Sequence, residues 1–395
     1  MRRMKYLFWL PAALAVFWAS CAPVETPSPG DRPQDTGDDD GPAKMPESLP
    51  PVRGGLKDRI EAALHQVWKR ELRTDNGFWT VFHAILGTGF ETTLQDPLTG
   101  KKVNAIEHIR SGGEVRGMEF IPTKNGLDVR TGPQFVGQGH QDQFVAEMVQ
   151  WGMTADKAFR VYDKDYTFMD FVRHSKMRAS VKSDQELSWA IIMIGEFYGT
   201  NITWTNEKGE RLTFDDVVRY ELEQPVGENA ACGGTHRLFG LTWAYFRHLE
   251  HGGKKVGVWK DVDAALDRYA QQARKYQNPD GTFSTKYLAG PGNAREIELR
   301  IGTTGHVLEW LAFALPAARL REQWVQDAAG ALSLLILDSQ SRSIESGALY
   351  HAAHGLHIYH DRVFGPMPDR KAPVIPLRPG EEIPKGASPA TSRGR

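Results

Sequence analysis

The sequence predicts an all-α protein arranged as an α/α toroid of about six helical hairpins, in which an outer ring of helices encloses an inner ring. Glycine-rich turns open nearly all-apolar helical segments at intervals of about fifty residues. Amphipathic helical segments, charged on one side only, lie between them. No stretch shows the sustained alternation of apolar and polar residues that half-buried strands require.

The N-terminal residues have the order of an export signal. Basic residues precede an apolar run from Tyr6 to Trp18, which is too short to cross a membrane as a permanent helix. The segment Ala19-Ser20-Cys21 is similar to the end of a bacterial lipoprotein signal, which implies acylation of Cys21 and a membrane anchor. Trp18 occupies a position where those signals prefer an aliphatic residue, so an ordinary secretory signal stays open. The lipoprotein alternative makes residues 1–20 the signal peptide, and either alternative exports the chain to the bacterial cell envelope.

Two proline-rich segments flank the predicted folded part. Residues 22–51 contain eight prolines and an acidic run, and residues 365–395 contain seven prolines. Such segments bury too little apolar surface to offset the entropy of ordering them. We expect residues 21–51 to form a disordered tether, residues 365–395 a disordered tail, and residues 52–364 one toroid domain.

Charge and cysteine content exclude several classes of protein. Lys and Arg number 48 against 49 Asp and Glu, so the net charge of −1 argues against a nucleic-acid partner. Two cysteines in 395 residues exclude a disulfide-rich scaffold and a zinc or iron–sulfur site built from several cysteines. If Cys21 is acylated, Cys232 is the only other thiol in the chain.

Three predicted inner helices begin with glycines followed by a histidine. These openings are Gly137–His140, Gly233–His236 and Gly302–His306, and apolar residues follow each of them. Looser segments of the same kind are Phe78–Leu86, Glu186–Tyr198 and Gly347–Tyr359. A helix that is apolar nearly all round is buried on both sides, as an inner helix of a toroid is.

The predicted outer helices carry charges on one face and an apolar stripe on the other. They cover Leu56–Leu72, Phe214–Leu222, Val262–Tyr276 and Arg321–Leu337. In the third of these, Val262, Leu266 and Tyr269 recur at three- and four-residue steps, while Asp261 and Asp263 lie off the stripe. The alternation of one-sided and fully apolar helices predicts the two rings.

The segment Gln277-Asn278-Pro279-Asp280-Gly281-Thr282-Phe283 resembles the Q-x-x-D-G-x-W/F turn between helix pairs of terpenoid cyclases and protein prenyltransferases. It follows a predicted outer helix and precedes the His306 segment, which is the position that those families give it. The resemblance covers residues 52–364 in architecture, although the motif occurs clearly once. It implies the toroid fold.

The residues that carry the activities of those families are missing. Class II terpenoid cyclases use an Asp-x-Asp-Asp cluster as a strong acid, and neither Asp163-Lys164-Asp165 nor Asp261-Val262-Asp263 completes one. Protein prenyltransferases hold zinc with an Asp-x-Cys pair, whereas Cys232 follows Ala230-Ala231. Fold analogy alone is a weak basis for function, so neither activity is carried over.

Three histidines are the strongest chemical lead. Each stands at the first turn of a predicted inner helix, and parallel inner helices place their first turns at one mouth of the central cavity. Glu309 lies three residues after His306 and shares its helix face, and Cys232 lies four residues before His236. The candidate catalytic residues are therefore His140, His236, His306 and Glu309. The candidate metal ligands are Cys232, His236 and His306.

Histidines that meet at one mouth suit metal binding, proton transfer or anion binding. A structural role is the alternative, because a histidine near a helix start often only satisfies a backbone group or a neighbouring carboxylate. The positive end of the helix dipole disfavours the protonated ring, so we expect these rings to be neutral. The sequence does not identify a cofactor.

Four further histidines recur at three-residue steps, namely His351, His354, His357 and His360. At about 100° per residue, each step turns the side chain by about 60° around a helix, so the four do not converge on one ion. Two neighbours in this series can pair. We expect the others to face solvent or neighbouring helices.

The sequence favours an exported, membrane-anchored toroid protein and leaves enzymatic activity open. In one alternative it is an envelope enzyme whose histidine-lined cavity takes a small molecule, either an isoprenoid-like compound or a carbohydrate. In the other it is a non-catalytic binding or scaffolding lipoprotein with a packed cavity. The absence of a phosphate loop, a serine nucleophile elbow and a paired-carboxylate signature favours the second alternative.

Overall fold

The computed structural model describes residues 54–132, 136–227 and 230–384. Within these ranges the chain forms 13 α-helices, one short 3-10 helix and four two-stranded antiparallel sheets. The protein is therefore mostly α, as the sequence predicts. Cys21, the signal peptide and the tether lie outside the described residues, so what the sequence indicates about them stays a prediction.

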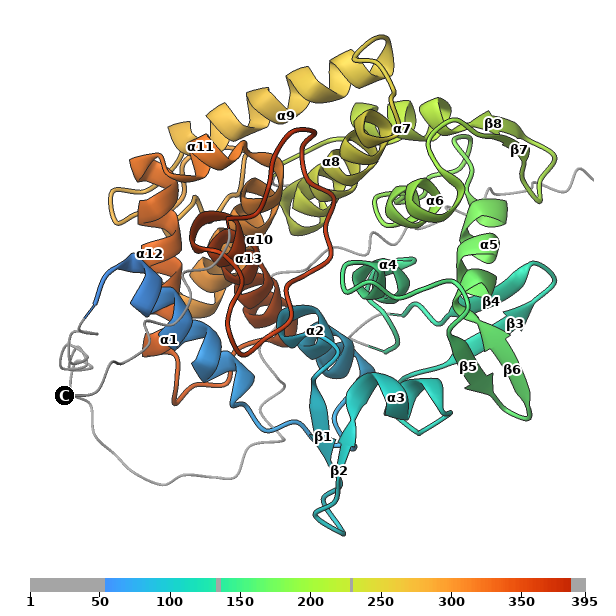
Figure 1. Cartoon of the computed structure of the whole chain (residues 1–395), viewed down its shortest axis with the longest axis horizontal. Helices are drawn as coiled ribbons and strands as arrows, with labels where there is room; N and C mark the ends of the chain where they lie inside the picture. Colours follow the sequence, from blue (N-terminus) through green and yellow to red (C-terminus); the bar gives the residue numbers. More distant parts are fainter. Residues whose placement is uncertain (1–53, 133–135, 228–229, 385–395) are drawn as a thin grey trace, which may run out of the picture.

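One set of helices lies in the middle of the molecule (Figure 1). These central helices are α2 (Phe78–Thr88), α4 (Gln143–Val149), α6 (Ala190–Tyr198), α8 (Thr235–Glu250), α10 (Ile297–Ala314) and α13 (Ser346–Phe364). Contacts lead from α2 through α4, α6, α8 and α10 to α13, and α13 packs again on α2. The central helices thus bring together side chains that lie far apart in the sequence.

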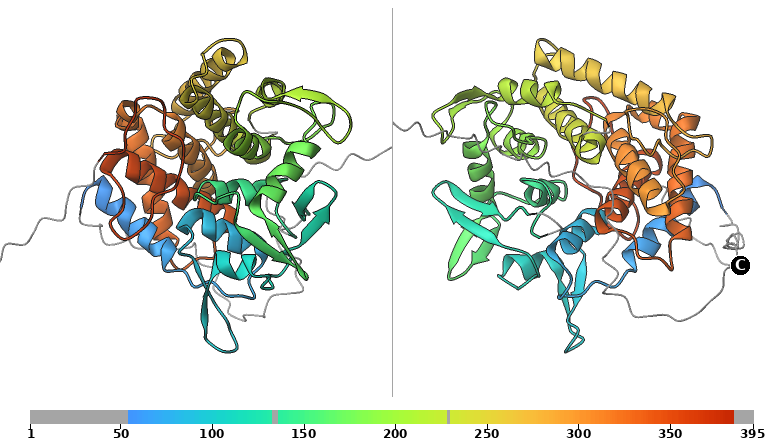
Figure 2. Two further views of the ribbon diagram at one scale, coloured as in Figure 1. Left: turned by 45° about the vertical axis from the view of Figure 1, so that its right-hand side comes forward. Right: turned by 180° about the vertical axis from the view of Figure 1, so that it is seen from behind.

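A second set of helices lies around the central ones (Figures 1 and 2). These peripheral helices are α1 (Leu56–Trp68), α3 (Ala105–Arg110), α5 (Phe168–Arg178), α7 (Phe214–Glu223), α9 (Val258–Lys275) and α12 (Gln323–Asp338). Apart from the four-residue α11 (Ala317–Leu320), peripheral and central helices alternate along the chain. α1 packs on α12, so the first and last peripheral helices are neighbours.

Burial separates the two sets as the hydrophobic pattern predicts. In α10 every residue from Ile301 to Ala314 is buried, because α8, α12 and α13 all pack against it. In α9 the buried residues form one face that includes Val262, Leu266 and Ala270, whereas charged residues such as Asp261 and Asp267 are exposed.

Four β-hairpins correct the expectation of an all-α chain. They are β1–β2 (Thr93–Gln95, Lys102–Asn104), β3–β4 (Phe120–Thr123, Gly126–Val129), β5–β6 (Ala158–Val161, Lys164–Thr167) and β7–β8 (Thr203–Thr205, Arg211–Thr213). Strands of three or four residues are too short for an alternating pattern to show. Three hairpins lead straight into a peripheral helix. At the start of α7, for example, the Asp216 carboxylate accepts a hydrogen bond from the Thr213 N–H over 2.8 Å.

Residues 365–384, named here the C-terminal strap, correct the predicted disordered tail. The strap crosses the C-terminal ends of central helices (Figure 1). The Val374 N–H donates to the carbonyl of Gln150, just after α4, over 2.7 Å. Arg378 Nη2 donates to the carbonyl of Ala314, the last residue of α10, over 3.1 Å. The folded part therefore extends beyond residue 364 to residue 384.

The strap is held by charge as well as by backbone contacts. Glu381 forms an ion pair with Arg362, whose side chain is only 4% exposed. Arg362 Nη1 also donates to the carbonyls of Ala312, Phe313 and Leu315 at the end of α10. This arrangement cannot be predicted from the proline-rich composition. A few specific side-chain partners hold the segment in place, and no periodic apolar pattern marks it.

Candidate metal centre

Five histidines from five regions of the central helices meet in the interior. His83 belongs to α2, His140 precedes α4, His236 lies in the first turn of α8, His306 lies in α10, and His351 lies in α13. The ring centroid of His236 lies 5.0 Å from that of His140, 5.2 Å from that of His306 and 5.1 Å from that of His351. The centroids of His306 and His351 are 4.3 Å apart, and those of His83 and His351 are 5.4 Å apart. We name these five residues the histidine cluster.

The three histidines expected to share a site are therefore neighbours, although they lie in the interior. His140, the most exposed residue of the cluster, is 8% exposed, and His306 is 5% exposed. Two aromatic rings cover the cluster, since Trp79 packs on His83 at 4.1 Å and Trp189 on His236 at 4.7 Å between centroids. A ligand that reaches these rings is largely removed from water.

The expected position of His306 is wrong in one respect. It lies in the middle of α10, which begins at Ile297, and not at a helix start. The glycines before it lie within α10 and do not form a turn. A Cβ at Gly305 would lie 2.7 Å from the Cβ of Ala352 in α13. Gly305 instead allows α10 and α13 to pack closely, which brings His306 next to His351.

Four rings of the cluster are fixed through Nδ1. His83 Nδ1 donates to the carbonyl of Trp79 over 2.8 Å, and His306 Nδ1 to the carbonyl of Gly302 over 2.7 Å. A carbonyl only accepts, so in these two rings the proton is on Nδ1 and the lone pair on Nε2. Nδ1 of His140 contacts Glu186, and Nδ1 of His351 contacts Glu309, over 2.7 and 2.8 Å respectively. In metal sites generally, one ring nitrogen of a ligating histidine has such a partner and the other binds the ion.

His236 has a different environment. Neither of its ring nitrogens has a hydrogen-bond partner among the residues that the structure describes, and the side chain is only 3% exposed. Within the same part of the chain, Nε2 of His351 also lacks a partner. A buried polar atom without a partner costs about 1–3 kcal/mol, so these nitrogens call for an explanation. A bound ion supplies one.

Glu309 is buried and charged, and its carboxylate contacts two histidines of α13. Its two carboxylate oxygens contact Nδ1 of His351 and Nδ1 of His354 over 2.8 and 2.6 Å. Burial alone would raise the pKa of Glu309, but the adjacent His351 and His354 outweigh it and lower the pKa to about 2. The predicted candidate therefore does not form a pair with His306 but fixes the orientation of His351.

Cys232 approaches the cluster through an unusual backbone. Its φ and ψ are 45° and 37°, a left-handed conformation that costs a residue with a side chain about 1–3 kcal/mol. Gly233 and Gly234 continue in the same region, with φ of 65° and 78°. A Cβ at Gly233 would lie 2.1 Å from the Tyr287 ring. The turn is therefore available only to this glycine-rich sequence, and it holds the thiol beside His236.

Potential ligand atoms form three overlapping groups in the described ranges, and within each group the atoms lie within 4.8 Å of one another. The groups are His140, Cys232 and His236; His236, His306 and His351; and His83, Glu147 and His351. The predicted set of Cys232, His236 and His306 is thus divided between two groups that share His236.

Sequence reasoning did not assign the third group. Glu147 is fully buried, which raises the pKa of its carboxyl well above the ordinary value. Gln143 Nε2 lies 2.9 Å from Oε1 of Glu147 and 3.1 Å from Nε2 of His83. The spacing of four residues between Gln143 and Glu147 is the signal that points to one helix face. His83 gives no signal of its own, because glycines do not precede it.

The later histidines of α13 do not join the cluster, and of the two surroundings expected for them, solvent or neighbouring helices, they have the second. His354, His357 and His360 are all at most 1% exposed. His360 Nε2 contacts the Glu61 carboxylate of α1 over 3.1 Å, and burial lowers the pKa of His357 to about 4. The four histidines of this helix therefore face different neighbours, in agreement with the rotation expected from their spacing.

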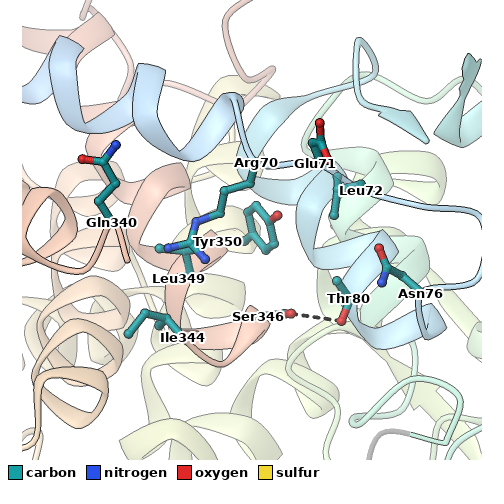
Figure 3. A pocket seen from close by; sticks show the side chains of 10 residues that line it. All are labelled: Arg70, Glu71, Leu72, Asn76, Thr80, Gln340, Ile344, Ser346, Leu349 and Tyr350. Carbon is teal, nitrogen blue, oxygen red and sulfur yellow. Dashed lines mark hydrogen bonds between the residues drawn. The ribbon is translucent and has the colours of Figure 1, made fainter. Parts of the chain in front are cut away.

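A cavity of about 320 Å³ lies elsewhere, between the end of α1, the start of α2 and the start of α13 (Figure 3). Its lining includes Arg70 and Tyr350, and Ser346 Oγ donates to Thr80 Oγ1 across it over 3.0 Å. None of the cluster histidines lines this cavity. The three groups of ligand atoms likewise include none of its residues.

No protein-family model, curated protein or solved structure matches the chain. Among the described helices, none combines the length and the apolar composition needed to span a membrane. The case for a function therefore rests on the geometry of the histidine cluster.

Proposed function

We propose that the histidine cluster binds a divalent transition-metal ion, with zinc as the best match, and that the ion is catalytic. The observation that carries the proposal is His236, whose two ring nitrogens are buried and without hydrogen-bond partners in the described part of the chain. Around it lie imidazole, thiol and carboxylate groups at ligand-to-ligand distances below 4.8 Å. These donor types are the ones that zinc prefers in proteins.

Electrostatics support a cation at this place. Burial lowers the pKa of both His83 and His236 well below the ordinary value, so these rings are neutral near pH 7 and available as ligands. Glu309 is ionised and only 5% exposed, and its charge lies directly behind His351. A buried carboxylate that orients a ligating imidazole is a frequent partner of zinc-bound histidine.

A catalytic role is supported by the number of donors. Each group offers three protein ligands, and catalytic zinc sites commonly have three, with water in the fourth position. Zinc lowers the pKa of such a water to about 7 and makes it a nucleophile for hydrolysis. The side chain of Glu186, which contacts His140, is 23% exposed, and we propose that solvent reaches the ion from this side.

We also propose that the fold is an α/α toroid and that the chain is located in the bacterial envelope. The alternation of central and peripheral helices supports an α/α toroid. Gln277 of the motif that resembles terpenoid cyclases donates to the carbonyl of Trp324 in α12 over 2.7 Å, which ties the turn to the next peripheral helix. Export with an anchor at Cys21 places the chain in the bacterial envelope, and an isoprenoid-like compound or a carbohydrate stays the proposed ligand.

The anchor has its own test. Changing Cys21→Ala should release the full chain from membranes without changing its thermal unfolding, because the tether separates the anchor from the folded part. A variant that still sediments with membranes after a salt wash would exclude lipidation at Cys21.

Metal binding is tested with the purified full chain. We expect zinc to remain bound after dialysis, and His236→Ala to lower zinc affinity by more than about 100-fold. The exposed His251→Ala serves as the matched control and should leave affinity unchanged. If the full chain takes up neither zinc nor cobalt, nickel or copper, the cluster is structural. The non-catalytic alternative would then be the better account.

A further inference from the structure

We infer that the histidine cluster is divided into two metal sites and holds two ions. Site A consists of His140, Cys232 and His236, and site B of His83, Glu147 and His351. The inference rests on the proposed function, because it presupposes that the cluster binds metal at all.

The groups of ligand atoms support this division. Sites A and B share no residue, and in each of them the ligand atoms lie within 4.8 Å of one another. The middle group joins them because it contains His236, His306 and His351. Assigning His236 to site A and His351 to site B gives each site three donors. His306, with its ring centroid 5.2 Å from His236 and 4.3 Å from His351, can complete either one.

A single ion in the middle group explains less of the structure. It would use His236, His306 and His351 and leave Glu147 buried at 0% exposure with Oε2 unpartnered among the described residues. It would also leave out the thiol of Cys232, which the left-handed turn holds beside His236. Two ions use both groups as ligands.

The donors of site A suit a soft ion. A thiolate selects zinc or copper among the metal ions that imidazole also binds. His140 is oriented by Glu186, and His236 contributes a buried nitrogen that has no other partner in the described ranges. The site thus combines a thiol held by the left-handed turn, an imidazole oriented by Glu186 and an imidazole that lacks a partner among the described residues.

Site B has two imidazoles and one carboxylate, which is a donor set of hydrolytic zinc enzymes. Gln143 Nε2 lies 2.9 Å from Glu147 Oε1 and 3.1 Å from His83 Nε2. Because an amide nitrogen only donates, both lone pairs point toward the place that it occupies. A cation that enters there takes the same two lone pairs, and the amide of Gln143 turns aside.

The two sites are tested by counting ions in the full chain. Equilibrium dialysis against zinc, followed by elemental analysis, should give two ions per chain. Cys232→Ser and Glu147→Gln should each reduce the number to one, whereas the exposed pair His251→Ala and Glu223→Gln should leave it at two. Zinc bound at one ion per chain overturns the inference and keeps the proposed function. Zinc bound at none overturns both.

Cobalt binding shows by its absorption spectrum which site is filled. Because it can be measured on the unmodified chain, this test does not depend on the folding of a variant. Titration of the unmodified full chain with cobalt should show two equivalents. A thiolate-to-cobalt charge-transfer band should grow with only one of them. The band should persist in Glu147→Gln and vanish in Cys232→Ser. Saturation of both the band and the visible absorption at a single equivalent contradicts two sites.

Discussion

The imidazole rings of His306 and His351 lie 4.3 Å apart between centroids, on two helices that pack along much of their length. Their closeness depends on small residues at the helix contact. Gly305 precedes His306 and faces Ala352, which follows His351. The geometry of the proposed metal centre is therefore set by the packing of α10 on α13.

Replacing Gly305 should disturb both the packing and the centre. In Gly305→Val, the new side chain meets Ala352, whose Cα would lie 2.8 Å from the added Cβ. The added side chain has to push α10 and α13 apart. We therefore expect the free energy of unfolding to fall by about 2 kcal/mol. Urea denaturation measures it. The neighbouring Gly302→Ala is the control, since its Cβ would lie 3.3 Å from the nearest atom and should cost clearly less.

Glu309→Gln should weaken metal binding without removing a ligand. The change removes the charge behind His351 and makes one of the two contacts to His351 and His354 unfavourable. We expect zinc affinity to fall between about 10-fold and 100-fold, as for other residues that orient ligating histidines. Competition with a coloured chelator gives the affinity. Glu223→Gln at the exposed end of α7 should change nothing, and equal affinities for all three proteins would exclude a positioning role for Glu309.

The C-terminal strap should contribute to stability. Glu381→Ala leaves Arg362, which is only 4% exposed, without its carboxylate. Breaking one side of a buried ion pair costs about 3 kcal/mol, so the urea midpoint should drop markedly. Glu382→Ala, at the next position, should cost less than about 0.5 kcal/mol. Identical midpoints for the two variants would mean that residues 365–384 do not pack as described.

His357 should make the protein sensitive to acid. Burial lowers its pKa from the ordinary value of 6.5 to about 4, while Asp361 opposes and His354, His360 and Arg370 add to the shift. Between these values the unfolded chain holds the extra proton, so the free energy of unfolding decreases as the pH falls from 6.5 toward 4. The slope from this residue is about 1.4 kcal/mol per pH unit.

The variant His357→Leu isolates this contribution. From about pH 6.5 to about pH 5 the unmodified protein should lose about 2 kcal/mol more than the variant, measured by urea denaturation at each pH. A parallel pH dependence in the two proteins would show that His357 is protonated, or partnered, in the folded state.

The order of the central and peripheral helices could be predicted from the hydrophobic pattern. A helix buried on one side has an apolar stripe, and a helix buried on all sides is apolar nearly all round. The nearly all-apolar segment around His306 and the one-sided stripe at Val262 both correspond to the observed burial. The hairpins and the strap could not be predicted in this way. They are fixed by capping residues such as Thr213 and by single ion pairs such as Arg362 with Glu381, which leave no periodic pattern.

The candidate site was predictable only in part, for a geometric reason. His140 and His236 follow glycines at helix starts, so local sequence marks them. His83 and His351 reach the same point from within helices, and their proximity depends on how α13 packs on α2. Packing between helices distant in sequence carries no local signal. The same reason explains why His306 was expected at a helix start.

X-ray absorption at the zinc edge of the zinc-loaded full chain shows directly whether the histidine cluster binds the ion. We expect imidazole scattering at zinc–nitrogen distances of about 2.0 Å together with a zinc–sulfur contribution at about 2.3 Å from Cys232. The sulfur contribution should disappear in Cys232→Ser while the imidazole scattering remains. A shell of oxygen neighbours alone, with neither imidazole nor sulfur, would mean that zinc binds elsewhere on the surface and would contradict a metal centre in the histidine cluster.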